Sequence, residues 1–449
     1  YGDYTETRGR KGGVSVLDGI RAAVSPETEV LYERGCNFLG QALHPFDPSM
    51  LRDENGESGL TGHYYNGPVP QGEPVQVRTD RTVNFNWIFA LPHPALDANC
   101  FSVVWTGSVV MPRTMDGCIG LSTQDSMRLY VDDKLLIDGW GKDKSADQAL
   151  DFHFEAGRTY KIRIEFVNDR RGARVIFGYS AGRENFPAAV EAARKADAAI
   201  LCMGDNEETS GENFDRTDLN LPGRQLELVQ AVYETGTPVV LVLQSGRPVT
   251  ANWENDHLPA ILEAWFPGEQ GGTAIAKTLF GDAAPGGRLP ITFPRSVGQI
   301  PCHYSRRPGG GKRYVEMDWL PLYPFGYGLT YTTFAYRDMA LSRSVIDPQD
   351  TVTVSVTVTN TGKYTGDAVP QLYVRDMFSS VVKPERQLAA FRRLTLAPGE
   401  SRRVELTVGP KQLRTLGPDY VWRVEPGKFE LQLGDNAENI LLRADLTVE

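Results

Sequence analysis

The stretch Ala198-Ala-Ile-Leu-Cys-Met-Gly-Asp-Asn-Glu-Glu-Thr-Ser-Gly-Glu-Asn-Phe-Asp-Arg216 decides the fold of the region around it. Its first half is a short apolar run that ends at Gly204, a pattern typical of a buried parallel strand. Its second half is a polar loop rich in carboxylates, with a helix expected from about Arg224. In open α/β sheets, ligands bind beyond the carboxyl ends of strands, and carboxylates there can give or take a proton. The stretch predicts an α/β fold in which this loop is either catalytic or a solvated acidic turn.

Strands and helices alternate on both sides of this stretch. The same region has a helix pattern at 186–196 and 224–234, strand patterns at 238–243 and 260–266, and a further helix pattern at 273–280. Near the amino terminus, Val14–Ala23 is typical of a helix and Thr28–Gly35 of a strand. Such alternation indicates a mostly parallel sheet with helices on both faces. We therefore expect residues 1–55 and 185–335 to form one α/β sandwich in two parts.

Two other regions lack this alternation and predict β-sandwiches. Residues 56–184 contain many short aromatic-rich strands with period-2 alternation, and residues 336–449 repeat strands between Pro and Gly turns. Both patterns are typical of all-β sandwiches, the second of an Ig-like one. The predicted fold class is therefore multidomain α/β plus all-β, with one β-sandwich inserted into the α/β domain and another following it.

Composition excludes several function classes. The net charge of −10 and the sequence pI of about 5.3 argue against a nucleic-acid partner, because phosphate binding needs basic patches. No apolar run approaches the roughly 20 residues of a membrane span. The five cysteines include no CxxC pair and the six histidines have no metal-ligand spacing, so we expect no metal and no cofactor. A bridge between Cys100 and Cys118 is one open possibility.

The loop resembles the acid/base segment of family 3 glycoside hydrolases. The resemblance rests on Ser210-Gly-Glu-Asn-Phe-Asp-Arg216 together with later blocks in the same order, at residues 264–272, 285–294 and 323–331. It implies a retaining, exo-acting β-glucosidase that releases terminal β-D-glucose from the non-reducing ends of oligosaccharides or glycosides. A β-xylosidase or arabinosidase of the same family, and a non-catalytic carbohydrate-binding fragment, remain alternatives.

The resemblance also assigns roles within the loop. Glu212 stands four residues before Arg216, where the family's proton donor is found, so it is the expected general acid/base, with Glu208 as runner-up. Arg216 is expected to support the loop by pairing with a carboxylate such as Asp215 or Asp218.

Residues 56–184 resemble the PA14 domain, which some family 3 β-glucosidases carry near the mouth of the active site. Trp140, in a Gly-rich loop, is therefore a candidate for stacking on sugar, although it could equally pack on its own sandwich. Some PA14 lectins bind calcium through an Asp-Asp pair, but Asp132-Asp133 is better explained as a hairpin tip. Residues 336–449 resemble the fibronectin type III-like domain that ends many of these enzymes.

The family takes its nucleophile, an Asp, from a (β/α)8 barrel of about 250 residues, for which this sequence has no room. We therefore expect the barrel on a companion polypeptide or an upstream segment, with this chain supplying the acid/base and the outer subsite walls. A periplasmic or secreted location is favoured, with any signal expected on that upstream segment.

Overall fold

The structure is a computed structural model that describes residues 13–36, 43–87, 91–123, 125–141, 148–169, 173–180, 186–206, 209–212, 214–309 and 313–449. It contains two compact units. One takes its described residues from the ranges 1–32, 191–222 and 229–449, and the other from 33–190 and 223–228.

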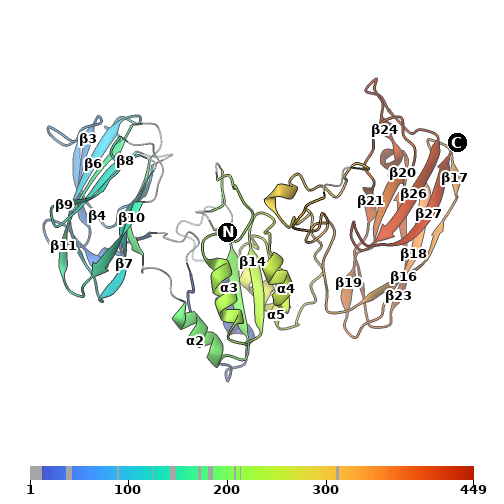
Figure 1. Ribbon diagram of the computed structural model, residues 1–449, viewed down its shortest axis with the longest axis horizontal. Helices are drawn as coiled ribbons and strands as arrows, with labels where there is room; N and C mark the ends of the chain where they lie inside the picture. The colour runs from blue at the N-terminus through green and yellow to red at the C-terminus, as the bar shows by residue number, and fades with distance from the viewer. Residues whose placement is uncertain are drawn as a thin grey trace. The chain divides into compact units, whose positions relative to one another are not determined.

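A three-stranded parallel sheet forms the centre of the α/β part (Figure 1). Its strands, in spatial order, are β13 (Ala199–Gly204), β14 (Val239–Gln244) and β15 (Ala260–Glu263). The apolar run of β14 is almost wholly buried because strands and helices cover it on every side. The carboxyl ends of all three strands therefore lie at one edge of the sheet.

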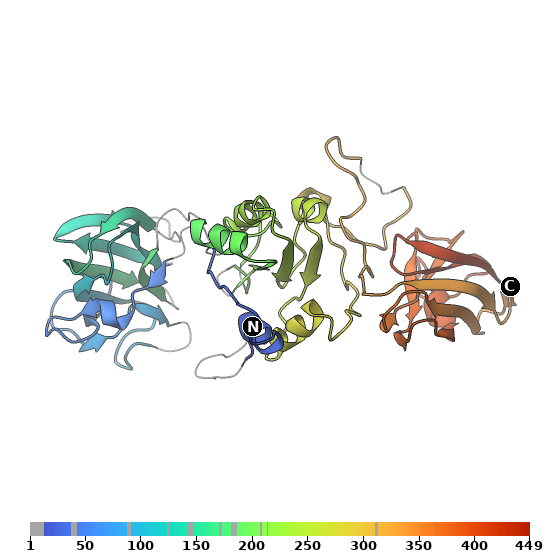
Figure 2. The same cartoon turned by 90° about the horizontal axis from the view of Figure 1, so that it is seen from below.

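Helices cover both faces of this sheet. They are α1 (Val16–Ala23), α2 (Pro187–Lys195), α3 (Gln225–Tyr233), α4 (Asn252–His257) and α5 (Gly271–Leu279). Figure 2 shows α1 and α5 side by side, across the sheet from α3. Ser15 caps α1, since its side chain accepts a hydrogen bond from the backbone N–H of Asp18. The predicted parallel sheet with helices on both faces is thus present.

The strand expected at Thr28–Gly35 does not form. This segment contains no assigned strand, and Leu31 and Tyr32 are exposed. A strand pattern specifies only which faces are apolar, whereas a strand also needs a neighbour to accept its backbone hydrogen bonds.

Residues 44–180 form two antiparallel sheets that share one core. The first sheet has the order β1-β12-β7-β10 with β5 beside β12, and the second β4-β3-β6-β11-β8-β9 with β2 beside β6. The strands are β1 (His44–Pro45), β2 (Leu51–Arg52), β3 (Leu60–Asn66), β4 (Gln76–Asp80), β5 (Asn84–Asn86), β6 (Phe101–Val110), β7 (Met115–Thr123), β8 (Ser126–Val131), β9 (Lys134–Asp138), β10 (Gln148–Phe154), β11 (Thr159–Asn168) and β12 (Arg174–Ser180), with the short helix η1 (Pro48–Met50).

Aromatic side chains from both sheets fill this core, with Trp105, Phe101 and Phe166 fully buried. The pairing of β1 with β12 and of β2 with β6 places residues 44–52 in these sheets, ahead of the boundary expected at residue 56. Two-residue strands are too short for alternation to appear in the sequence.

The carboxyl-terminal part is a second sandwich, whose main sheets are β16-β18-β23 and β17-β27-β26-β20-β21. A core of aliphatic side chains with Phe429 packs between them. The elements are β16 (Phe334–Leu341), β17 (Val345–Ile346), β18 (Val352–Asn360), β19 (Gly366–Ala368), β20 (Gln371–Asp376), β21 (Gln387–Phe391), β22 (Leu394–Leu396), β23 (Ser401–Val408), α6 (Pro410–Leu413), β24 (Thr415–Leu416), β25 (Trp422–Arg423), β26 (Gly427–Gly434) and β27 (Ile440–Val448). The short helix η2 (Val297–Gln299) precedes this sandwich.

Among the helices that the structure describes, none is both long and apolar enough to cross a membrane.

Candidate active site

The acidic loop begins where β13 ends, at the carboxyl edge of the sheet. Asp205 follows β13 directly, and its backbone N–H donates to the carbonyl of Gln244 at the end of β14. Its side chain is fully buried. The Thr209 hydroxyl donates to Asp205 Oδ1 at 3.2 Å and accepts a hydrogen bond from the backbone N–H of Asn206. The loop therefore starts from a rigid, buried carboxylate.

Arg247, just beyond β14, ties the two ends of this loop together. Its Nη2 donates to Asp205 Oδ1 at 3.2 Å, and its Nε lies 3.0 Å from Asp205 Oδ2 in an ion pair. The same guanidinium donates to the backbone carbonyls of Leu219 (2.9 Å) and Asn220 (3.0 Å) on the far side of the loop. The side chain of Arg247 is only 15% exposed, so this pair is shielded from water and holds the loop firmly.

Thr250 adds a second anchor on the same side. Its backbone N–H donates to the carbonyl of Leu219, and its hydroxyl donates to Asn220 Oδ1. Asp218 accepts the backbone N–H of Asn220 at 2.8 Å, which shapes the exit of the loop. Among the described residues between these anchors, Glu212, Phe214 and Asp215 are exposed.

Glu212 lies in that segment, and its side chain is exposed to solvent. The runner-up, Glu208, lies outside the described residues. Asp215 is exposed and Arg216 is half-buried, and within the described residues no ion pair joins Arg216 to Asp215 or Asp218. In this structure the cation that anchors the loop is Arg247, and the supporting role of Arg216 and Asp215 stays a prediction.

Glu263 brings a second buried carboxyl to the same edge, at the end of β15. Burial is the main cause that raises the pKa of Glu263 to about 8, and the charge of Asp205 also raises it. A hydrogen bond from the Trp265 backbone N–H to Glu263 Oε1 (2.9 Å) acts in the opposite direction and lowers this pKa. Trp265 has a φ of 52°, an uncommon value for a non-glycine residue. A carboxyl whose pKa is raised this far by burial is a feature common at catalytic sites.

Sequence reasoning missed Arg247 and Glu263. Arg247 lies in the loop after the strand predicted at 238–243, and this position is the signal that could have found it. Glu263 lies within the strand predicted at 260–266, and only the structure ends that strand at Glu263. Both interact with Asp205, which precedes Arg247 by 42 residues and lies on a different strand end from Glu263.

Trp140 belongs to the other unit and is half-buried. The guanidinium of Arg128 lies 4.8 Å from the centre of its ring, and Arg128 also pairs with Asp138. This contact covers part of the ring from within its own sheet. Contact of Trp140 with sugar stays a prediction.

Asp132 and Asp133 form the turn between β8 and β9, and both have positive φ. Their carboxylates pair with Arg158 and Lys161. No group of three candidate metal ligands occurs among the residues that the structure describes, and no disulfide joins Cys100 to Cys118.

Two family models match the chain. The glycosyl hydrolase family 3 C-terminal domain matches residues 1–331, and the fibronectin type III-like domain matches residues 368–437. A β-xylosidase of Formosa agariphila is 46% identical over 302 residues, covering 65% of this chain and 42% of that protein. A β-glucosidase of Rhizobium radiobacter is 34% identical over 469 residues, covering 97% of this chain and 55% of that protein.

Solved structures agree with these matches. A β-glucosidase of Kluyveromyces marxianus, solved in complex with glucose, has a TM-score of 0.77 at 27% identity, covering all of this chain and 57% of its own. A β-glucosidase of Erythrobacter marinus has a TM-score of 0.57 at 40% identity, covering 58% of this chain and 36% of its own. The chain thus spans about half the length, or less, of the relatives that it matches.

Proposed function

Because the chain belongs to glycosyl hydrolase family 3, we propose that it is part of a retaining, exo-acting β-glucosidase in which it supplies the general acid/base. The observation that carries this proposal is the loop at the carboxyl edge of the sheet. Asp205 and Arg247 clamp both ends of the loop, and Glu212 is exposed between them. A proton donor must reach its substrate while its backbone stays fixed, and this arrangement provides both.

In the proposed mechanism, Glu212 is protonated when substrate binds and gives its proton to the glycosidic oxygen as the bond to the anomeric carbon breaks. A retaining enzyme needs a second carboxylate about 5–5.5 Å away as nucleophile. We propose that this carboxylate is an Asp on a (β/α)8 barrel, carried by an upstream segment or companion polypeptide. Glu212, by then ionised, takes a proton from the water that hydrolyses the glycosyl-enzyme.

A β-xylosidase is the second candidate, and the 46% identity to the Formosa agariphila β-xylosidase favours it. The two activities differ at the sugar that occupies the cleavage subsite. Parallel assays with aryl β-glucosides and aryl β-xylosides distinguish them by the ratio of kcat/KM.

Replacement of Glu212 by Gln in the natively purified protein tests the proton-donor role. We expect kcat for glycosides with poor leaving groups to fall by about 10²–10⁴-fold, because their departure needs the proton. Activated aryl glycosides, whose leaving groups depart without a proton, should lose much less in the bond-breaking step.

The matched control is Glu227→Gln, which alters an exposed carboxylate on α3 that pairs with Arg224. Glu227→Gln should leave kcat unchanged for both classes of substrate. An equal, small effect of Glu212→Gln on both substrate classes would contradict the assignment, and the corresponding variant of Glu208 would then be tested.

A further inference from the structure

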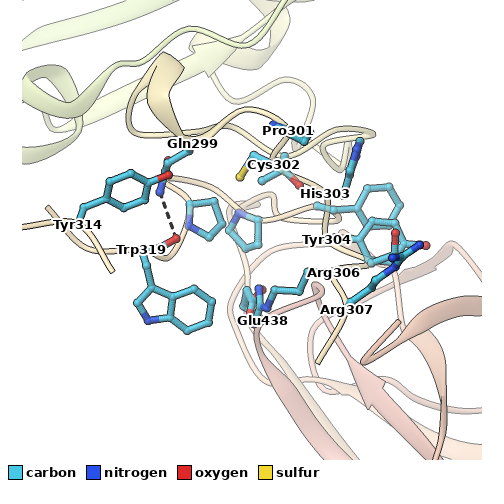
Figure 3. Close-up of a pocket in the computed structure, with 15 residues that line it drawn as sticks. Gln299, Pro301, Cys302, His303, Tyr304, Arg306, Arg307, Tyr314, Trp319 and Glu438 are labelled. Carbon is cyan, nitrogen blue, oxygen red and sulfur yellow. Dashed lines mark hydrogen bonds and ion pairs between the residues drawn. The ribbon is translucent and has the colours of Figure 1, made fainter. Parts of the chain in front are cut away.

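A cavity of about 360 Å³ lies between the segment that leaves the α/β part and the second sandwich (Figure 3). Its walls come from Thr292, from residues 299–307 and 314–325, and from the β26–β27 loop that carries Glu438. None of the residues that line it belongs to the acidic loop at 205–222. Its volume falls within the range of about 300–1,000 Å³ that small-molecule sites occupy.

Aromatic rings and prolines give the cavity a rigid shape. Tyr304 and Phe325 stack with their ring centres 4.3 Å apart, and Tyr304 also accepts a hydrogen bond from the backbone of the second sandwich at Leu388. Gln299 is buried and donates to the backbone carbonyl of Trp319 at 3.1 Å, which positions that residue at the edge of the cavity. A pocket that is already shaped loses little entropy when a ligand enters.

Trp319 offers an aromatic surface at this edge. Its side chain is 40% exposed although it lines the cavity, and the guanidinium of Arg306 lies 4.6 Å from the ring centre. The arginine fixes the orientation of the indole and leaves the rest of the ring open. An exposed, oriented indole is suited to contact with an apolar C–H surface of a ligand.

Arg306, Arg307 and Glu438 are the charged residues that line the cavity. Arg306 donates to Glu438 Oε1 at 2.6 Å and pairs with Glu385 at 3.3 Å, and all three side chains are mostly shielded from solvent. Carboxylate oxygens beside a guanidinium present acceptors and donors together. These charged groups disfavour a wholly apolar ligand.

We propose that this cavity binds a neutral saccharide unit, such as the glucosyl or xylosyl residue of an oligosaccharide. A pyranose ring combines an apolar C–H face with neighbouring hydroxyl groups, each both donor and acceptor. The C–H face contacts Trp319, and the hydroxyl groups bond to Glu438 and to the Arg306 guanidinium. The choice of a neutral saccharide rests on the proposed function, whereas the amphiphilic character of the ligand follows from the aromatic and charged lining of the cavity.

The test uses the Glu212→Gln variant, produced with 5-fluorotryptophan in place of tryptophan and purified natively. Its ¹⁹F resonances are followed as cellobiose or xylobiose is added. The chain contains seven tryptophans, and the resonances of two are assigned by the variants Trp319→Phe and Trp422→Phe. Trp422 is the matched control, because it is 53% exposed and lies under Arg414 at 4.4 Å but does not line the cavity.

We expect the Trp319 resonance to shift in a saturable way with millimolar affinity, and the Trp422 resonance to stay in place. Glu438→Gln, which keeps the size of the side chain, should weaken this binding about tenfold because a hydrogen bond to a charged group is lost. The fluorine spectrum of that variant also shows whether it is folded.

Two results would overturn the inference. One is a Trp319 resonance that does not move with either disaccharide, and the other is a resonance that responds to inorganic phosphate instead. The outcome is independent of catalysis, since the readout is local. Saccharide binding at Trp319 in a protein without glycosidase activity would keep this inference and reject the proposed function.

Discussion

Glu263 is the residue whose chemistry is most altered by its surroundings in the α/β part. Its carboxyl lies at the sheet edge with one oxygen, Oε2, buried and without a hydrogen-bond partner. The folded protein therefore favours the neutral acid, and its pKa of about 8 lies well above the ordinary value of 4.5.

This shift predicts a pH dependence of stability. Because the folded-state pKa is the higher one, the contribution of Glu263 to stability is fully present below about pH 4.5 and is lost as the pH rises towards 8. Glu263→Gln, which cannot ionise, should reduce the fall in the free energy of unfolding between pH 5 and pH 8 by on the order of 1–3 kcal/mol. Urea unfolding at several pH values measures this.

Glu227→Gln is again the control, since that exposed carboxyl has a pKa lowered by its hydrogen bond to Arg224. Glu227→Gln should leave the change in the free energy of unfolding between pH 5 and pH 8 the same as in the parent protein. The prediction would be contradicted if the free energy of unfolding of Glu263→Gln fell between pH 5 and pH 8 by as much as that of the parent protein.

At the scale of elements, the contact between α1 and α5 depends on glycine. Gly19 and Gly272 are both buried, and a Cβ on Gly272 would stand 2.0 Å from the carbonyl oxygen of Ser15. A Cβ on Gly19 would likewise meet the Gly272 carbonyl at 2.1 Å. The two helices can approach this closely only because neither residue has a side chain.

Gly272→Ala should therefore destabilise the α/β part by about 1–3 kcal/mol or more, because backbone atoms would have to move. Gly287→Ala provides the comparison, since a Cβ there meets no atom within 4 Å and its φ is not positive. Denaturant unfolding of both variants measures the difference. Equal stability of the two variants would show that the helices separate without cost.

At the scale of the whole molecule, the proposed division of labour predicts the composition of the active protein. Natively purified material that hydrolyses aryl β-glucosides should contain a barrel-bearing segment in addition to these 449 residues, because the nucleophile is proposed to lie there. Intact mass and denaturing gels, combined with activity across the purification, measure this. Hydrolysis by the 449-residue chain alone would contradict the proposal.

The sequence by itself determined the fold class and the place of the acidic loop. The buried run before Asp205 and the alternation of strands and helices follow from local apolar patterns, which the chain carries in its own order. The family blocks pointed to Glu212 and Glu208 in the same way, because a motif is contiguous. The division into four segments remains a prediction, as does the PA14 resemblance.

Only the tertiary structure decided which groups meet. Arg247 reaches Asp205 across 42 residues of sequence, Glu263 is influenced by Asp205 from a different strand, and Arg306 meets Glu438 across 132 residues. The strand expected at Thr28–Gly35 failed for the same reason, since pairing is a property of two segments. Local patterns specify which side chains are buried, but a contact between distant residues depends on the path of the chain between them.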